Sequence, residues 1–170
     1  MNVLGKTAVV TGAANGIGKA LVTELLGDCG RVFALDRDER ALSALKDGLT
    51  SAKLSVFPVD LTDRVRVHAV ASKISADANG EIDLLINCAG IIQPFELFAD
   101  TSVERIEKIM NVNFWGTVHT IQAFLPSLMK RPEAHIVNIS SMGAFFPVPG
   151  QTIYGASKAA VRMLSEGLYA

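Results

Sequence analysis

Cysteine, tryptophan and unbalanced charge are scarce in this 170-residue sequence. Its two cysteines, Cys29 and Cys88, are too few and too far apart for a disulfide framework or a zinc site, which favours a reducing compartment such as the cytoplasm. Sixteen Lys and Arg residues nearly balance seventeen Asp and Glu residues. Because this balance gives no attraction to polyanions, we expect neither nucleic acid nor a membrane surface as a partner.

Long hydrophobic runs are also missing. No apolar stretch approaches the roughly 18–20 residues that are needed to cross a bilayer. Residues 1–18 contain no signal-peptide core, because their short apolar run passes directly into glycines. His68, His119 and His135 share no metal-ligand spacing, so we expect no metal site.

Apolar residues nevertheless make up 49% of the sequence, in short segments separated by turns and amphipathic stretches. The pattern predicts strands over residues 7–10, 31–35, 54–59, 82–86 and 135–139. It predicts helices over residues 16–26, 39–49, 64–76, 101–130 and 152–170. Regular alternation of strand and helix is typical of a parallel sheet with right-handed crossovers. We therefore expect one α/β domain over residues 1–170, built on a doubly wound parallel sheet.

The longest predicted helix contains a local anomaly. Thr101 and Glu104 have capping-box spacing at its start. Its apolar stripe consists of Val103, Ile106, Met110, Phe114, Ile121 and Leu125. Asn113 lies on this stripe, where an amide costs free energy unless it is paired. The Asn113 side chain serves the structure by bonding to neighbouring backbone, or it has a role in the function of the protein. The two roles are compatible.

A glycine-rich turn, TGAANGIG at residues 11–18, joins the first predicted strand to the first predicted helix. A pyrophosphate must approach the backbone closely in such a turn, and a Cβ atom would block it. The amides and dipole of the helix start then favour the negative charge. The residues expected to contact a dinucleotide here are Gly12, Asn15, Gly16, Ile17 and Gly18. A plain glycine turn that allows helix packing is the alternative.

Asp36 ends the second predicted strand, 18 residues after Gly18. The dinucleotide fold places a carboxylate there for the hydroxyl groups of the adenosine ribose. A carboxylate repels a 2′-phosphate, so NAD is favoured over NADP, although the adjacent Arg37 offers a partner for that phosphate. An ordinary helix N-cap is the alternative role of Asp36.

In these residues the sequence resembles the short-chain dehydrogenase/reductase family. Residues 11–18 match its TGxxxGxG pattern, and Asn87-Cys88-Ala89-Gly90 is similar to its NNAG motif, with Cys88 in place of the second asparagine. Asn113, Ser141, Tyr154 and Lys158 match its catalytic tetrad in order. The resemblance implies a Rossmann-type three-layer sandwich with strand order 3-2-1-4-5, and an NAD(H)-dependent oxidoreductase that interconverts a secondary alcohol and a ketone.

The resemblance also implies a role for each member of the tetrad. Tyr154 exchanges the alcohol proton, and Lys158, four residues later on one helix face, favours the phenolate and holds the nicotinamide ribose. Ser141 bonds to the substrate oxygen; we choose it over Ser140 because it lies thirteen positions before Tyr154, a spacing that resembles the family's. Asn113 holds a water that links Lys158 to solvent.

Further residues are expected to surround the cofactor. Asp60, with Leu61 beside it, ends the third predicted strand and is expected near the adenine ring; capping the next helix is an equally good interpretation of Asp60. Asn87 is expected to brace the central strands more than it contacts cofactor. Ala89 and Gly90 are small enough to let the cofactor pass.

The apolar stretch at residues 142–149 beside Ser141 suggests a hydrophobic substrate, with packing or a subunit contact as the alternative. By analogy with the family we expect a homo-oligomer, a dimer or a tetramer. The alternatives to an oxidoreductase are a scaffold that binds NAD without turnover and a non-redox enzyme such as an epimerase. The helical pattern continues to Ala170 without a capping glycine, and the family's C-terminal third is missing, which favours a break within a longer protein.

Overall fold

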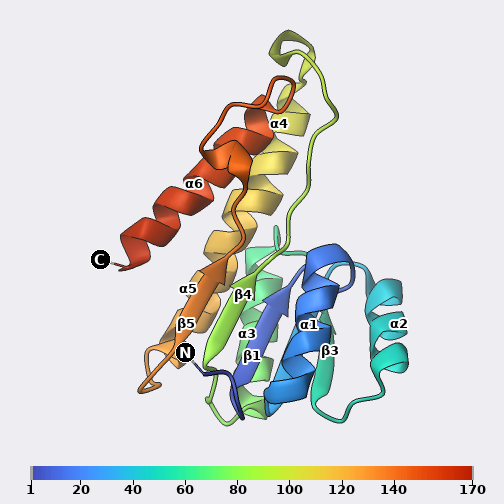
Figure 1. The fold of residues 1–170 in the computed structure, drawn as a ribbon, viewed down its shortest axis with the longest axis vertical. Coiled ribbons are helices and arrows are strands. Elements are labelled where there is room, and N and C mark those ends of the chain that lie inside the picture. Colours follow the sequence, from blue (N-terminus) through green and yellow to red (C-terminus); the bar gives the residue numbers. More distant parts are fainter. Residues whose placement is uncertain (1, 170) are drawn as a thin grey trace.

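The fold is a five-stranded parallel sheet with helices on both faces, as a computed structural model that describes residues 2–169 shows (Figure 1). The strand order is β3-β2-β1-β4-β5, which confirms the predicted order. The strands are β1 (Thr7–Thr11), β2 (Arg31–Asp36), β3 (Leu54–Pro58), β4 (Leu84–Asn87) and β5 (His135–Asn138). Among the strands the largest boundary error lies at β4, which begins two residues later than the 82–86 segment predicted for it.

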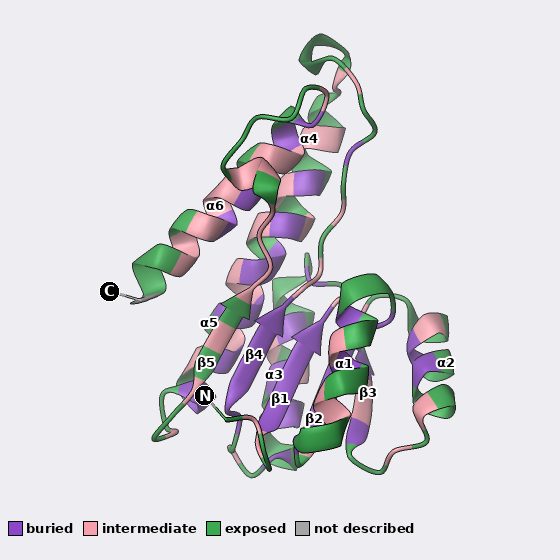
Figure 2. Cartoon of the chain, in the orientation of Figure 1, coloured by how far each residue is buried: buried purple, intermediate pink, exposed green. Residues whose placement is uncertain are grey.

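The helices form two layers, because successive side chains of a strand point to opposite faces. They are α1 (Gly16–Asp28), α2 (Glu39–Leu49), α3 (Arg64–Asp77), α4 (Val103–Met110), α5 (Gly116–Leu128) and α6 (Thr152–Tyr169). Val9 of β1 packs in the core cluster formed with α3 and α5, whereas Ala8 and Val10 pack in the cluster formed with α1 and α2. Figure 2 shows β1 and β4 buried along their length and the edge strand β5 partly exposed.

The predicted long helix is not uniform. A π-helical segment, Asn111–Trp115, separates α4 from α5, and the Gly116 amide bonds to the Asn111 carbonyl five residues back. Because the extra residue shifts the buried face of the helix, the predicted apolar stripe is wrong as a core face. Val103 is exposed and only Ile121 of the stripe is fully buried, whereas Asn113 is completely buried.

The start of α4 also differs from the prediction. The residue that caps the helix is Ser102, whose hydroxyl accepts from the Arg105 amide, and the Thr101 hydroxyl instead donates to the Leu97 carbonyl. The predicted cap at Thr101 is therefore one residue too early, and the predicted capping box is wrong, because the third residue after Ser102 is Arg105 and not Glu104. Glu104 remains in the first turn, where hydrogen bonds, the largest from its own backbone, lower the pKa of its carboxyl.

A buried ion pair holds the edge of the sheet opposite the strands' carboxyl ends. Asp83, only 2% exposed, accepts from the Thr7 amide at 2.9 Å and from Arg131 Nε at 2.7 Å. The hydrogen bond to Asp83 raises the pKa of Arg131. This pair joins β1, β4 and the end of α5 on the side of the sheet away from the glycine turn.

Replacing Asp83 with alanine is expected to destabilise the protein without a direct effect on ligands. The buried Thr7 amide loses its acceptor, which costs about 2–3 kcal/mol of unfolding free energy. Thermal unfolding should then occur about 5–10 °C lower. Glu81→Ala is the matched control: its exposed carboxylate also contacts Arg131, at 3.2 Å, and should change the midpoint by less than about 2 °C. Equal midpoints for the two variants would contradict this assignment.

Candidate functional site

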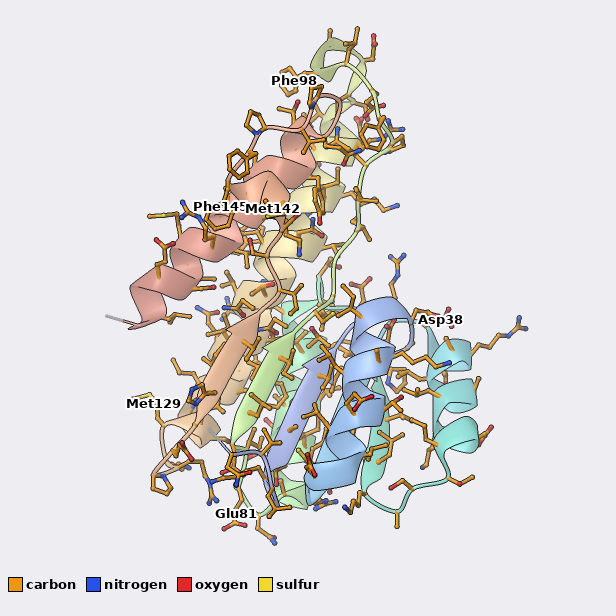
Figure 3. All side chains as sticks on the ribbon, in the orientation of Figure 1. Asp38, Glu81, Phe98, Met129, Met142 and Phe145 are labelled. Carbon is orange, nitrogen blue, oxygen red and sulfur yellow. The ribbon has the colours of Figure 1, made fainter. Side chains whose placement is uncertain are left out.

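A cavity of about 650 Å³ opens along the carboxyl edge of the sheet. Five loops line it, one after each strand, and α6 closes it with Tyr154 and Lys158. In parallel α/β sheets this edge is where ligands bind. Figure 3 labels Asp38 at this edge and Glu81 at the opposite edge. The site therefore lies where the topology of the sheet predicts it.

The glycine turn forms the floor of the cavity and tolerates no Cβ atom at two positions. At Gly12, with φ +65°, an added Cβ would lie 2.7 Å from the Ala89 Cα. At Gly18 it would collide with the Gly12 carbonyl. Asn15 caps α1 without a side-chain hydrogen bond, so the first amides of this helix keep no side-chain partner from their own cap residue. A close, anion-accepting cradle results, which fits a pyrophosphate.

Thr11 fastens the cradle to the neighbouring strand. Its hydroxyl oxygen, fully buried, accepts from the amides of Cys88 at 3.1 Å and Ala89 at 3.2 Å. The two loops that approach each other at Gly12 are thus joined by hydrogen bonds as well as by close packing.

Asp36 lines the cavity beside this cradle and does not cap a helix. Its Oδ2 accepts from the Ala14 amide at 3.1 Å and its Oδ1 from the Asp38 amide at 3.0 Å. The cap of α2 is Asp38, which accepts from the Ala41 amide. The N-cap alternative for Asp36 is therefore wrong, and Asp36 braces the glycine turn while it faces the cavity with Arg37.

The capping alternative for Asp60 is also wrong. Asp63 caps α3, whereas Asp60 accepts from the amide and the hydroxyl of Thr62 in a local turn. Asp60, Leu61 and Thr62 all line the cavity. The backbone carbonyl of Leu61 is paired with the His119 ring at 2.9 Å, which ties this loop to α5.

Lys158, which lines the cavity, and Asn113, which is outside its lining, both lie close to Gly90. A Cβ atom added to Gly90 would lie 3.2 Å from Lys158 Nζ and 3.4 Å from Asn113 Oδ1. The Lys158 ammonium donates to the Ile139 carbonyl at 2.8 Å. Burial lowers the pKa of Lys158, so its charge is maintained at a cost in free energy.

Both polar atoms of the Asn113 side chain form hydrogen bonds within the protein. Its Oδ1 accepts from the Ile91 amide at 2.8 Å, and its Nδ2 donates to the Ile91 carbonyl and to the Ser157 hydroxyl, both at 2.9 Å. The Ser157 hydroxyl in turn donates to the Tyr154 carbonyl at 2.7 Å. The expected bonds of the Asn113 side chain to backbone are thereby confirmed, and the water that links Lys158 to solvent stays a prediction.

The two candidate serines point in different directions. The Ser140 hydroxyl donates to the Lys158 carbonyl, and Ser140 lines the cavity. The Ser141 hydroxyl accepts from the Gly143 amide, and an added Cβ at Gly143 would contact both Ser141 Oγ and the Tyr154 ring. Ser141 is outside the cavity lining, whereas Ser140 lines the cavity with its hydroxyl bonded to the α6 backbone. The choice of Ser141 over Ser140 stays a prediction.

Asn87 does not line the cavity. Its amide donates to Asn138 at 2.8 Å and accepts from the Thr120 hydroxyl at 2.6 Å, so it joins β4, β5 and α5. The expected bracing role is confirmed. Several residues for which the sequence predicted no cofactor contact also line the cavity: Asp38, Val59, Thr62, Cys88, Ile91, Ile92, Val112, Ile139 and Ser140. Five of these nine residues lie within two positions of the end of a strand, and the rule that ligands bind at the carboxyl ends of strands could have found them.

Cys88 occupies the cavity wall where the family motif has asparagine. Burial raises the pKa of its thiol, so it is a poor nucleophile and packs as a small side chain. Among residues 2–169, no cluster of three or more His, Cys, Asp or Glu side chains is arranged to hold a metal ion. None of the helices described in this range is long and apolar enough to cross a membrane.

The sheet order, the glycine cradle and the cavity define a dinucleotide-type α/β fold, and comparison with known proteins gives the family. The family model for short chain dehydrogenases matches residues 6–170. The chain belongs to the short-chain dehydrogenase/reductase family. It is 34% identical over 163 residues to an uncharacterized oxidoreductase of Staphylococcus aureus (strain MW2), and 36% identical over 166 residues to one of Staphylococcus saprophyticus. Each alignment covers 96% of this chain and 70% of the relative.

Solved structures show the same fold. A short-chain dehydrogenase/reductase from Burkholderia phymatum in complex with NAD superimposes with a TM-score of 0.92 at 32% identity, covering 99% of this chain and 60% of that one. A metagenomic short-chain oxidoreductase in complex with NADP gives 0.90 at 29% identity, covering 99% and 76%. Serine dehydrogenase from Escherichia coli gives 0.88 at 32% identity, covering 95% and 74%. The chain thus spans about three fifths to three quarters of these structures.

Proposed function

We propose that the protein is an NAD(H)-dependent oxidoreductase that interconverts a secondary alcohol and a ketone. One observation carries the proposal: Tyr154 and Lys158, one helical turn apart on α6, close the end of a cavity whose other end is the glycine cradle and Asp36. A scaffold that only binds nucleotide has no use for a phenol and a costly buried ammonium at this place.

In this proposal, different residues of the chain bind different parts of the dinucleotide. The amides at the start of α1 and Gly12 hold the pyrophosphate, Asp36 the adenosine ribose, and Asp60 with Leu61 the adenine. Lys158 holds the nicotinamide ribose. A bound nicotinamide supplies or accepts the hydride.

Proton transfer belongs to the side chains at the other end of the cavity. In the reductive direction the phenol of Tyr154 gives its proton to the substrate oxygen, and in the oxidative direction it takes that proton back. Ser141 donates a hydrogen bond to the same oxygen as charge develops there. The Lys158 ammonium favours the phenolate that remains after the proton has left.

The test is turnover with NADH over a panel of ketones, followed by the loss of NADH absorbance. Tyr154→Phe removes only the exchangeable proton and should lower the rate by about 10²–10⁴-fold. Its affinity for NADH should stay within about threefold, because the cradle is unchanged. Equal rates for the two proteins would remove Tyr154 from the chemistry, and absence of NADH binding would remove the proposal altogether.

Asp36 supports a preference for NAD over NADP. Its carboxylate faces the cavity and accepts hydrogen bonds from only two backbone amides, so its charge opposes a 2′-phosphate. Arg37 lines the same cavity and works against the preference. NADP is therefore the weaker ligand in this proposal.

Asp36→Ala is expected to reverse part of this preference. Loss of the brace on Ala14 weakens both nucleotides alike, whereas loss of the carboxylate removes a partner of the 2′-hydroxyl and a repulsion of the 2′-phosphate. The ratio of the two dissociation constants should therefore move toward NADPH by about tenfold or more, which corresponds to one charged hydrogen bond. Fluorescence titration with NADH and NADPH measures it; an unchanged ratio would contradict the assignment of Asp36.

A hydrophobic substrate is the finer proposal. Met142, Phe145 and Phe146 follow Ser141 and expose between 60% and 70% of their surface. Figure 3 labels Met142 and Phe145 beside α6, beyond the carboxyl edge of the sheet. Exposed apolar side chains that follow Ser141 in the chain favour an apolar ligand, and the same surface also suits contact with a second copy in a homo-oligomer. Two free thiols suit a cytoplasmic location.

A further inference from the structure

Gln93 connects the cofactor-facing loop after β4 to the start of the helix that carries Tyr154. Its side chain is buried, with 3% of its surface exposed. Its Oε1 accepts from the amides of Ile153 and Tyr154, both at 3.0 Å. Because both partners are N–H donors, the atom that faces them is the oxygen. Its own carbonyl accepts from Gln151 Nε2 at 2.8 Å.

These bonds replace a conventional helix cap. The first amides of a helix have no partner within the helix, and a residue just before it normally accepts from them. In α6 the acceptor is a side chain about sixty positions earlier in the chain. The hydrogen bonds that hold the first turn of α6 therefore come from the loop after β4, and not only from the residues that precede the helix.

The other end of this connection is equally fixed. Ile91, two residues before Gln93, is held by both polar atoms of the Asn113 amide, and Gly90, Ile91 and Ile92 line the cavity. Gln93 therefore links the cavity wall to the backbone of the residue that bears the phenol. A shift of this link moves Tyr154 relative to the cavity wall.

We infer that Gln93 is a positioning residue, which sets the place of the Tyr154 phenol relative to the cofactor-facing loop by bonding to the Tyr154 and Ile153 amides. The inference rests on the proposed function for its catalytic consequence. Its structural part is independent, because the pairing of the two amides is measurable in the absence of substrate.

The test compares Gln93→Met, which keeps the length and volume but removes the acceptor, with Gln93→Glu, which keeps an acceptor where the helix dipole favours negative charge. Hydrogen exchange at the amides of Ile153 and Tyr154 should quicken at least tenfold in Gln93→Met, on the scale of one lost buried hydrogen bond. It should stay close to wild type in Gln93→Glu. The chain has only two tyrosines, so ring-labelled tyrosine gives a separate NMR signal for Tyr154, which should shift in Gln93→Met alone.

Turnover gives the third measurement. A misplacement on the order of 1 Å can cost up to about 10²-fold, so kcat should fall about 10–100-fold in Gln93→Met, with KM for NADH changed less than about threefold. Ser127→Ala is the matched control. It removes a partly buried hydrogen bond between Ser75 and Ser127, at 3.0 Å, and should lower stability without changing kcat or the Tyr154 signal.

The outcomes separate the two proposals. Wild-type amide exchange and an unshifted Tyr154 signal in Gln93→Met would overturn the positioning role. Faster exchange with unchanged kcat would overturn it as well, since the helix end would then be loosened without consequence for the phenol. Absence of turnover in the wild type would instead remove the proposed function, while exchange and the tyrosine signal would still decide whether Gln93 positions Tyr154.

Discussion

Lys158→Met is expected to abolish most turnover while the protein stays as stable as the wild type or becomes more stable. The ammonium is buried among Gly90, Asn113 and Ile139, and burial lowers its pKa, so the folded state bears a desolvation cost. Methionine fills a similar volume without charge. The rate should fall about 10²–10⁴-fold, and thermal unfolding should occur at the same or a higher temperature at neutral pH.

The pH dependence of stability provides a sharper check. Below the lowered pKa of Lys158 the desolvation cost is fully present in the wild type. Between that pKa and the ordinary value of 10.5, the unfolded state binds more protons than the folded state, so wild-type stability rises with pH relative to the variant. Lys46→Met on the exposed face of α2 is the control and should alter neither turnover nor this trend. A wild type that loses stability relative to Lys158→Met over this interval would refute the buried-ammonium interpretation.

Gly12→Ala is expected to eliminate nucleotide binding and to destabilise the fold. The residue has φ +65°, and an added Cβ would lie 2.7 Å from the Ala89 Cα and 2.8 Å from its amide nitrogen, which are backbone atoms of the loop after β4. Backbone strain and overpacking together cost about 2–5 kcal/mol, which lowers the midpoint by about 5–15 °C. Affinity for NADH should fall at least about 100-fold because the cradle must open. Calorimetry and fluorescence titration measure both effects.

Gly27→Ala is the matched control within the same helix-and-turn unit. An added Cβ at Gly27 meets no atom, and alanine is the better helix former by about 0.5–1 kcal/mol. This variant should be slightly more stable than the wild type and should bind NADH equally well. If both glycine variants bound NADH like the wild type, close backbone approach would not be what the turn provides.

The fold and most of the cavity followed from local patterns. The parallel sheet, the two helical layers and the position of the glycine turn follow from the alternation of short apolar segments with amphipathic stretches, whereas the strand order was implied by the resemblance to the family. The spacing of Gly18 and Asp36 follows from the same alternation, since the rest of α1 and the strand β2 lie between the glycine turn and the end of β2. Residues at the carboxyl ends of strands were accessible to the same reasoning.

The features that the sequence did not predict correctly depend on contacts that a local pattern does not determine. Thr101 and Ser102 both have a hydroxyl that could cap α4. The Arg105 amide donates to the Ser102 hydroxyl, so Ser102 is the cap. The π-helical segment arises where Asn113 is drawn inward to bond Ile91, 22 positions earlier. Gln93 has no motif at all, because its partners lie about sixty positions away and are backbone amides. Long-range polar contacts of this kind become visible only in three dimensions.

The most direct measurement is a crystal structure of the chain with NAD bound. The account predicts the pyrophosphate against the amides at the start of α1, the adenosine ribose at Asp36, and the nicotinamide ring beside Tyr154 and Lys158. A nucleotide bound elsewhere, or a carboxyl edge that remains closed to it at saturating concentration, would contradict the account.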